Sequence, residues 1–327
     1  MSNDQEIIDQ HFLPQCYING FVNESGVLYT LDLKLFAERG KVPYARESTP
    51  AKICKDKHFY TVDERAKVYN LGGVIDKYQV EKSFHNYENN FRQLIAKITT
   101  GAPLTYNEAS SLIRIIIDLK YRNKFYRDKM IEPRQGRVIE EAFVELQSSF
   151  DNDPAFRAKY EGITPQEWAA VNQQVRDQLL NDPDFKKSAH LSSLVNREDG
   201  YEALLQSLIP KLLACAWVVL KSDGQFISND NPGCSLDSNT KVNNTYFDKD
   251  FLFVIPLSAS VCLTISDAQQ DISFINDQHF KRYPVVDAPQ NMIEMSNSFA
   301  VKNFNKIAFG PVKTLLDDLA KNLRIEN

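Results

Sequence analysis

A long central stretch with helical periodicity, flanked by segments of short extended runs, is the feature that most constrains the fold of this chain. Apolar side chains recur at helical spacing through most of residues 63–222, whereas residues 1–62 and 223–327 alternate short apolar runs with turns. No low-complexity linker separates the three parts. The pattern predicts an α+β fold: a predominantly helical body with short β-strands from the N-terminal and C-terminal thirds. We expect one compact domain over residues 1–327.

Local signals place several helix starts within the central stretch. Thr164 stands three residues before Glu167, with a proline between them, and Thr105 stands three residues before Glu108. In such a capping box, the threonine and the acidic side chain each satisfy a free backbone N–H of the first turn. The apolar residues 202–221 are interpreted as one buried helix, bent at a proline.

The charge and the cysteines limit the class of protein. A formal net charge of -5 argues against a general nucleic-acid coat, although a local basic groove is compatible with it. The five cysteines lie far apart and form no CxxC pair, so neither a zinc site nor a disulfide scaffold is indicated. The first residues lack the pattern of a signal peptide, and the most apolar run is too short to cross a bilayer. We expect a soluble, cytoplasmic protein with reduced thiols and no membrane partner.

Sequence signatures of the major cofactor-binding and hydrolytic classes are missing. The chain has no GxGxxG, no GxxxxGK followed by Ser or Thr, no HExxH and no GxSxG. Nicotinamide, flavin and P-loop chemistry therefore lose support. The cofactor is unknown, and a divalent metal is left open.

One histidine lies beside a predicted helix start. His11 stands three residues before Pro14, and proline suits the first position of a short helix. Free amide groups at such a start can hold an anion, and a histidine beside it can exchange a proton. The alternative is a histidine that caps or packs against the helix, and a lone histidine favours this simpler interpretation.

Short polar side chains follow a predicted strand at residues 228–232. Asp230, at the end of that strand, can act as a general base or a metal ligand. The same composition also makes an ordinary turn, because Asn, Asp and Ser side chains bond to their own backbone. Spacing alone favours the turn.

Eight basic residues and three aromatic residues share the stretch 114–137. Basic side chains with interleaved aromatics can hold phosphates and stack bases. A helix with one solvated face, paired with neighbouring acids, is the alternative that charge runs usually favour. Arg122 is the exception, because it follows an apolar helix face and can point inward.

The order of these motifs matches a known family. Residues 11–21, HFLPQCYINGF, resemble the start of the domain-of-unknown-function family four-two-three-eight, which opens with a histidine and a proline three residues on. Further islands of similarity follow at residues 50–54, 59–61, 88, 122, 217, 226–232, 255–258 and 297. Residues 151–200 depart from the pattern and are interpreted as an insertion or a divergent helical part.

The resemblance implies a set of site residues, because the polar members of the islands would not be needed for core packing alone. As catalytic residues we expect His11 (general acid or base), Asp230 (base or metal ligand), Arg122 (charge stabiliser) and Glu88 (orienting Arg122 or His11). As substrate-binding residues we expect Gln15, Ser228, Asn231 and Asn297.

Two functions stay open at this point. The first is an enzyme, such as a hydrolase, acting on a phosphate-containing substrate that is a nucleotide or a nucleic acid. A role in bacterial defence or toxicity is left open with it. The alternative is a non-catalytic module that binds a ligand or a protein, in which the polar residues form a structural network. The oligomeric state is likewise left open.

Overall fold

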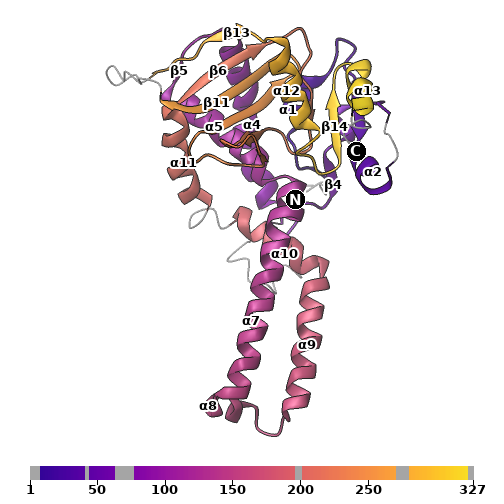
Figure 1. Cartoon of the computed structure of the whole chain (residues 1–327), viewed down its shortest axis with the longest axis vertical. Coiled ribbons are helices and arrows are strands. Elements are labelled where there is room, and N and C mark those ends of the chain that lie inside the picture. Colours follow the sequence, from indigo (N-terminus) through magenta and orange to yellow (C-terminus); the bar gives the residue numbers. More distant parts are fainter. Residues whose placement is uncertain (1–7, 41–43, 63–76, 196–200, 270–279, 323–327) are drawn as a thin grey trace, which may run out of the picture.

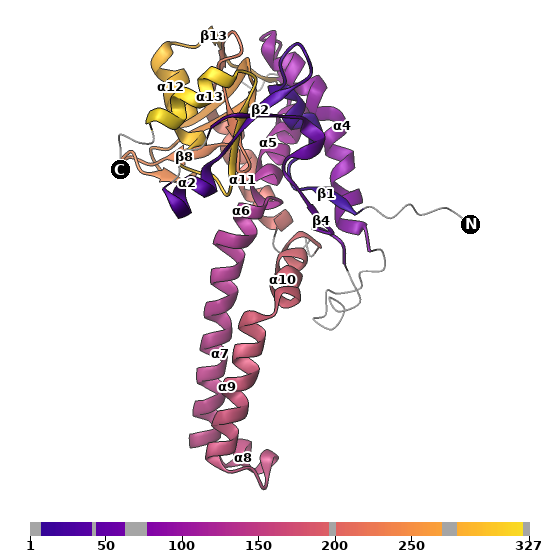
Figure 2. The same ribbon diagram turned by 90° about the vertical axis from the view of Figure 1, so that its right-hand side faces the viewer.

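The computed structural model describes residues 8–40, 44–62, 77–195, 201–269 and 280–322. It is 53% helical and 20% strand, with strands from both chain ends, which confirms the α+β class. The strands and several helices form one body, from which a pair of long helices extends (Figures 1 and 2). Within the described ranges, no helix has the combined length and hydropathy that a membrane span requires.

The larger sheet takes its six strands from the C-terminal half, in the order β13-β6-β11-β10-β8-β9. All its contacts are antiparallel except the parallel pair β13–β6. Its strands are β6 (Cys215–Lys221), β8 (Cys234–Leu236), β9 (Val242–Asn243), β10 (Leu252–Ser258), β11 (Val261–Gln269) and β13 (Val285–Asp287). Phe253 and Ile255 of β10 pack in one apolar cluster and Val254 in another. The strand is therefore buried on both faces, which explains its unbroken apolar run.

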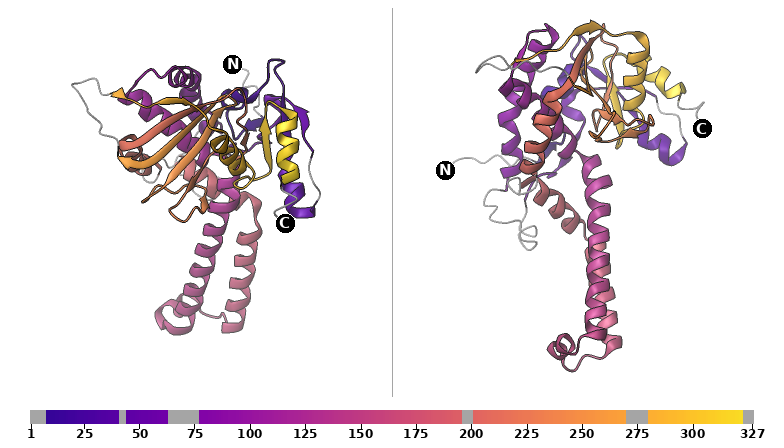
Figure 3. Two further views of the ribbon diagram at one scale, coloured as in Figure 1. Left: turned by 45° about the horizontal axis from the view of Figure 1, so that its top comes forward. Right: turned by 60° about the vertical axis from the view of Figure 1, so that its left-hand side comes forward.

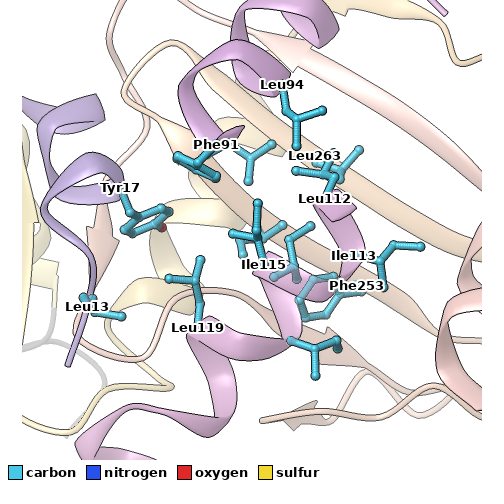
Figure 4. Packing of buried hydrophobic residues seen from close by; sticks show 14 of the residues in the cluster. Leu13, Tyr17, Phe91, Leu94, Leu112, Ile113, Ile115, Leu119, Phe253 and Leu263 are labelled. Carbon is cyan, nitrogen blue, oxygen red and sulfur yellow. The ribbon is translucent and has the colours of Figure 1, made fainter. Parts of the chain in front are cut away.

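Helices cover both faces of this sheet (Figures 1 and 3). The helices on the larger core are α4 (Gln79–Thr99), α5 (Tyr106–Tyr121) and α11 (Glu202–Ala214), and α12 (Gln290–Ala300) covers the other face. In the core, Phe91 of α4 and Ile115 of α5 lie against Phe253 and Leu263 of the sheet (Figure 4). The predicted capping box of α5 is confirmed, since the Thr105 side chain accepts from the backbone of Glu108.

The smaller sheet joins segments from the two chain ends in the order β3-β2-β14-β7. Its strands are β2 (Leu28–Asp32), β3 (Arg46–Ser48), β7 (Ser228–Asn229) and β14 (Ile307–Gly310), with α2 (Leu33–Arg39) and α13 (Lys313–Asn322) beside them. The remaining elements of the body are β1 (Asp9–His11), α1 (Gln15–Ile18), β4 (Lys55–Lys57), β5 (Leu104–Thr105), β12 (Phe280–Lys281) and the 3-10 turns Asn19–Phe21 and Pro50–Lys52. Strand β1 pairs with β4, and β5 pairs with β12.

The long helices form an arm that points away from the body (Figure 2). It contains α7 (Glu132–Asn152), α8 (Pro154–Arg157), the 3-10 turn Ala158–Tyr160 and α9 (Pro165–Asn181), and it follows α6 (Lys124–Tyr126) and the π turn Arg127–Ile131. Helix α10 (Pro183–Val195) returns to the body, where Leu191 and Leu194 pack in the larger apolar cluster. At the tip of the arm, the rings of Phe150 and Trp168 stack with centroids 4.6 Å apart. The predicted capping box of Thr164 and Glu167 is confirmed at the start of α9.

The expected single helix over residues 202–221 is wrong in its second half. Helix α11 ends at Ala214, and the following residues form β6, which pairs with β11 and β13. In a short apolar run, the spacing of the hydrophobic residues does not distinguish a buried strand from a buried helix. Pairing with neighbouring strands made residues 215–221 a strand. The ammonium of Lys281 donates to the carbonyl oxygens of Leu213 and Cys215 and so caps the helix end. The helical middle therefore ends earlier than residue 222, and its first part, residues 63–76, lies outside the described residues.

Candidate functional site

A cleft of about 690 Å³ is lined by residues of the smaller sheet and α2, by β4 and the segments before it, and by Lys124 of α6. We call it the basic cleft. The basic residues that line it are Lys34, Arg39, Arg46, Lys52, Lys55, Lys124 and Lys306. The acidic residues that line it are Asp32, Asp56, Asp128 and Asp230. Since seven positive charges face four negative ones, the cleft attracts anions although the whole chain is acidic.

Asp230 lies at the floor of the basic cleft, with 1% of its surface exposed. Its carboxylate oxygens accept hydrogen bonds from the backbone amides of Asn305, Lys306 and Ile307, at 2.9, 2.8 and 3.3 Å. Burial raises the pKa of Asp230 to about 6, although these amide bonds act in the opposite direction. A carboxyl group with this pKa exchanges its proton close to neutral pH.

His11 does not line the cleft but adjoins two residues that do, Phe12 and Lys55. It is the direct cross-strand partner of Lys55, a residue of the cleft wall. Burial lowers the pKa of His11, and the charge of Lys55 lowers it further, so the ring is neutral at pH 7. The side-chain amide nitrogen of Gln15 lies 3.3 Å from Nε2 of His11. The ring can therefore accept a proton while Gln15 orients it.

Arg122 holds the backbone of that histidine. Its guanidinium donates to the carbonyl oxygen of His11 at 3.0 Å and to the hydroxyl of Tyr60 at 3.3 Å. It also lies 3.9 Å from the ring centroid of Phe84. The cavity next to it measures about 10 Å³, which is room for one water at most. Glu88 belongs to α4, but its side chain lies outside the described part of the structure.

Asn231 is completely buried at the centre of a second polar cluster. Its side-chain oxygen accepts from Lys120 and from Asn123, both at 2.9 Å. Its side-chain nitrogen donates to Asn244 at 2.9 Å and to the carbonyl of Asn303 at 3.1 Å. These bonds join segments distant in sequence, so this amide ties the end of α5, the start of α6, the segment after β9 and the loop before β14 together.

Lys120 supplies a buried positive charge to this cluster. Its ammonium donates to both oxygens of Asn231 and to the carbonyl of Gly233, at 2.9, 3.3 and 2.6 Å. Burial lowers the pKa of Lys120 to about 7. The sequence interpretation placed it on a solvated basic face. Its position four residues after the buried Ile116 was the signal that it points inward.

Ser228 and Asn297 lie in two further buried positions. The hydroxyl oxygens of Ser228 and Tyr17 are 2.7 Å apart. The Asn297 amide accepts from the backbone of Ile227 at 3.0 Å and donates to the carbonyl of Gln225 at 2.9 Å. Both side chains thus fix the segment that leads into β7.

Gly233 ends this polar turn and cannot carry a side chain without strain. Its φ is +75°, and an added Cβ would lie 2.9 Å from Cβ of Ile255. We expect Gly233→Ala to lower the free energy of unfolding by about 2–4 kcal/mol, measured by urea denaturation. Gly26→Ala is the matched control, because Gly26 has φ +74° with no atom within 4 Å of an added Cβ. An equal loss in both variants would contradict the packing part of the argument.

The expected site residues therefore divide into separate groups. His11, Gln15 and Arg122 form one contact cluster next to the basic cleft without lining it, and Asp230 lies at its floor. Asn231, although adjacent in sequence to Asp230, belongs to the buried cluster of Lys120. Sequence reasoning did not find the cleft lysines and arginines, because they are scattered singly through the N-terminal third and beyond.

No group of three or more His, Cys, Asp or Glu side chains in the described part of the chain is placed to hold a metal ion. No curated protein and no solved structure matches the chain significantly. One family model matches residues 9–310, nearly the whole length, and carries the description "Protein of unknown function (DUF4238)". The match includes both polar clusters and the basic cleft. This chain is therefore a member of the DUF4238 family, whose function is unknown.

Proposed function

We propose that the basic cleft binds a phosphate-containing substrate, a nucleotide or a nucleic acid, and that the protein acts on it enzymatically. The observation that carries this proposal is the convergence of seven basic side chains around a carboxyl group with a pKa of about 6. Phosphate groups are recognised by clustered lysine and arginine side chains. Phosphoryl chemistry in turn needs a group that can accept or donate a proton near neutral pH.

Part of the positive charge in the cleft is free to meet a ligand. Lys55 and Lys124 are each paired with an aspartate at 2.6 Å. By contrast, Arg46, Lys52 and Lys306 form no ion pair with any residue that the structure describes. An anionic ligand therefore does not have to break existing ion pairs to contact these three side chains.

The chemical roles follow from these positions. Asp230 would act as the acid or base at the floor of the cleft, and neutral His11 as a second proton acceptor next to the cleft. Arg122 would act by positioning His11, since its guanidinium is bound to the His11 backbone. The cytoplasm remains the compartment we expect, since all five cysteines are free thiols. A role in defence or toxicity stays part of this proposal.

A second candidate function, a non-catalytic binding module, is favoured by a different observation. Asn231, Ser228 and Asn297 are buried, and each makes hydrogen bonds to other parts of the chain. Such side chains stabilise a fold and do not contact a ligand. In this alternative the basic cleft binds its anion without transforming it.

Charge reversal in the cleft tests the binding step. We expect the Lys52→Glu/Lys306→Glu variant to bind ATP or tripolyphosphate at least about tenfold more weakly than wild type in isothermal titration calorimetry. Lys302→Glu is the control, because Lys302 is exposed on the surface but does not line the basic cleft. Unchanged affinity in the double variant, with Lys302→Glu also unchanged, would exclude the basic cleft as the binding site.

The catalytic step is tested by His11→Ala and Asp230→Ala against nucleotides and oligonucleotides, with and without divalent metal. We expect wild-type turnover that rises with pH through about 6, as the Asp230 carboxyl loses its proton. Because Asp230→Ala leaves three backbone amides unpaired, its folding is checked by circular dichroism, and His11→Ala provides the second variant. Full activity in both folded variants would exclude His11 and Asp230 as the catalytic groups, and a wild type that binds these ligands without turnover would support the binding module.

A further inference from the structure

An exposed tyrosine stands on the wall of the basic cleft. Tyr44 lines the cleft, and 61% of its surface is exposed, more than any other large aromatic side chain among the described residues. The guanidinium carbon of Arg46 lies over its ring, 4.6 Å from the centroid. Arg46 thus covers one face of the ring, while most of the residue's surface stays exposed.

The backbone that follows this tyrosine is anchored to the smaller sheet. Ala45, the next residue, is 2% exposed and packs in the apolar cluster of the smaller sheet. Its amide donates to the carboxylate of Asp317 at 2.9 Å. Arg46 begins β3 and is paired with Thr30 of β2. The two residues that follow Tyr44 are therefore held in place, which limits the ordering entropy that is lost when a ligand binds to the ring.

We infer that Tyr44 is a stacking platform for a nucleobase, so that the ligand of the basic cleft is a nucleotide unit. This inference rests on the proposed function and narrows it. A cation over one face of an aromatic ring leaves the opposite face for a flat π system, and base–aromatic stacking is tolerant of sequence. The neighbouring cations Lys52 and Lys306 would meet the phosphates. The cleft volume of about 690 Å³ lies within the range of ordinary small-ligand sites.

Competing anions of the same charge lack this contact. Inorganic polyphosphate, a sugar phosphate or an acidic peptide can meet the lysines of the cleft, but none of these ligands needs a flat aromatic surface. A nucleotide unit has both the phosphate and the flat ring. Phosphate binding and base stacking are the same for a free nucleotide and for a nucleotide within a single strand. The experiment below distinguishes these two ligands.

The test compares four ligands by isothermal titration: ATP, a five-residue thymidine oligonucleotide, tripolyphosphate and an abasic deoxyribose-phosphate oligomer of equal length. We expect Tyr44→Leu to weaken binding of the base-containing ligand by about 5- to 150-fold, the range for loss of one stacked base. Tyr44→Phe keeps the ring and should retain affinity. Tyr106→Leu removes another exposed tyrosine, outside the cleft, and should leave binding unchanged.

The results separate this inference from the proposed function. Tighter binding of ATP than of the oligonucleotide identifies a free nucleotide as the ligand, and the reverse identifies a single strand. Either result supports the inference if Tyr44→Leu lowers the affinity for the ligand that binds more tightly. If Tyr44→Leu leaves every affinity unchanged while Lys52→Glu/Lys306→Glu weakens all four, the phosphate site stands and the stacking inference is overturned. Equal weakening of base-containing and base-free ligands by Tyr44→Leu also overturns it. If wild type binds none of the four ligands, the proposed function itself fails.

Discussion

Replacing Asn231 with leucine is expected to lower the free energy of unfolding by about 3–5 kcal/mol. The amide is fully buried and makes four side-chain hydrogen bonds, one of them to the ammonium of Lys120. Leucine fills nearly the same volume, so the loss measures unpaired polar groups and not an empty space. Urea denaturation of the purified variant gives the value.

The size of this loss should depend on pH in a direction that Lys120 sets. Burial lowers the pKa of Lys120 from its ordinary value of 10.5 to about 7. Wild type therefore gains stability from this group as the pH rises from about 7 towards 10.5, where the unfolded chain still holds the proton. Below pH 7 the ammonium is charged in the fold and needs its acceptors. Asn231→Leu should thus cost more at pH 6 than at pH 9.

Two further variants isolate the cause. Asn239→Leu makes the same change at an exposed asparagine, and we expect it to alter stability by no more than about 0.5 kcal/mol. Adding Lys120→Met to Asn231→Leu removes the stranded charge, so the double variant should be more stable than Asn231→Leu alone. Strictly additive losses would contradict a direct coupling between Asn231 and Lys120.

Removing the Arg122 side chain is expected to cost at least about 3 kcal/mol and to release β1. The guanidinium bonds the His11 backbone and Tyr60 and packs over the ring of Phe84. Arg122→Ala leaves these groups without their common partner. Chemical denaturation measures the stability, and hydrogen exchange of residues 9–11 reports whether the strand has loosened.

The conservative variant separates charge from geometry. Arg122→Lys keeps the positive charge but loses the planar group that reaches two acceptors at once, so its stability should lie between those of wild type and Arg122→Ala. Arg137→Ala, at an exposed position of α7, is the matched arginine control and should be close to neutral. If Arg122→Ala were no worse than Arg137→Ala, a positioning role for Arg122 would be excluded.

The polar residues of the family motifs were recognisable from the sequence, but which of them lie close together in the fold was not. Asp230 and Asn231 are neighbours in the chain, yet one faces the basic cleft and the other the buried Lys120 cluster. Sequence spacing has no information on which way consecutive side chains point once a strand has ended. The distribution of these residues over separate positions therefore had to come from the structure.

The basic cleft could not be predicted from the sequence either. The sequence drew attention to the basic stretch 114–137, of which Lys124 lines the cleft while Lys120 is buried elsewhere. The other cleft cations come from α2, which supplies two, and singly from β3, the turn before β4, β4 itself and the loop before β14. Single surface lysines and arginines are common in any chain, and only their assembly by sheet pairing makes them notable.

By itself, the sequence determined the α+β class and the local starts of α5 and α9, because capping and periodicity depend on residues within one or two helical turns. The α+β description with which the pattern began is confirmed. Tertiary structure alone decided that residues 215–221 form β6, that an arm leaves the body, and that Arg46, Asp230 and Lys306 share one cleft. The strand outcomes depend on pairing between β-strands that lie far apart in the chain, whose energies no local pattern contains.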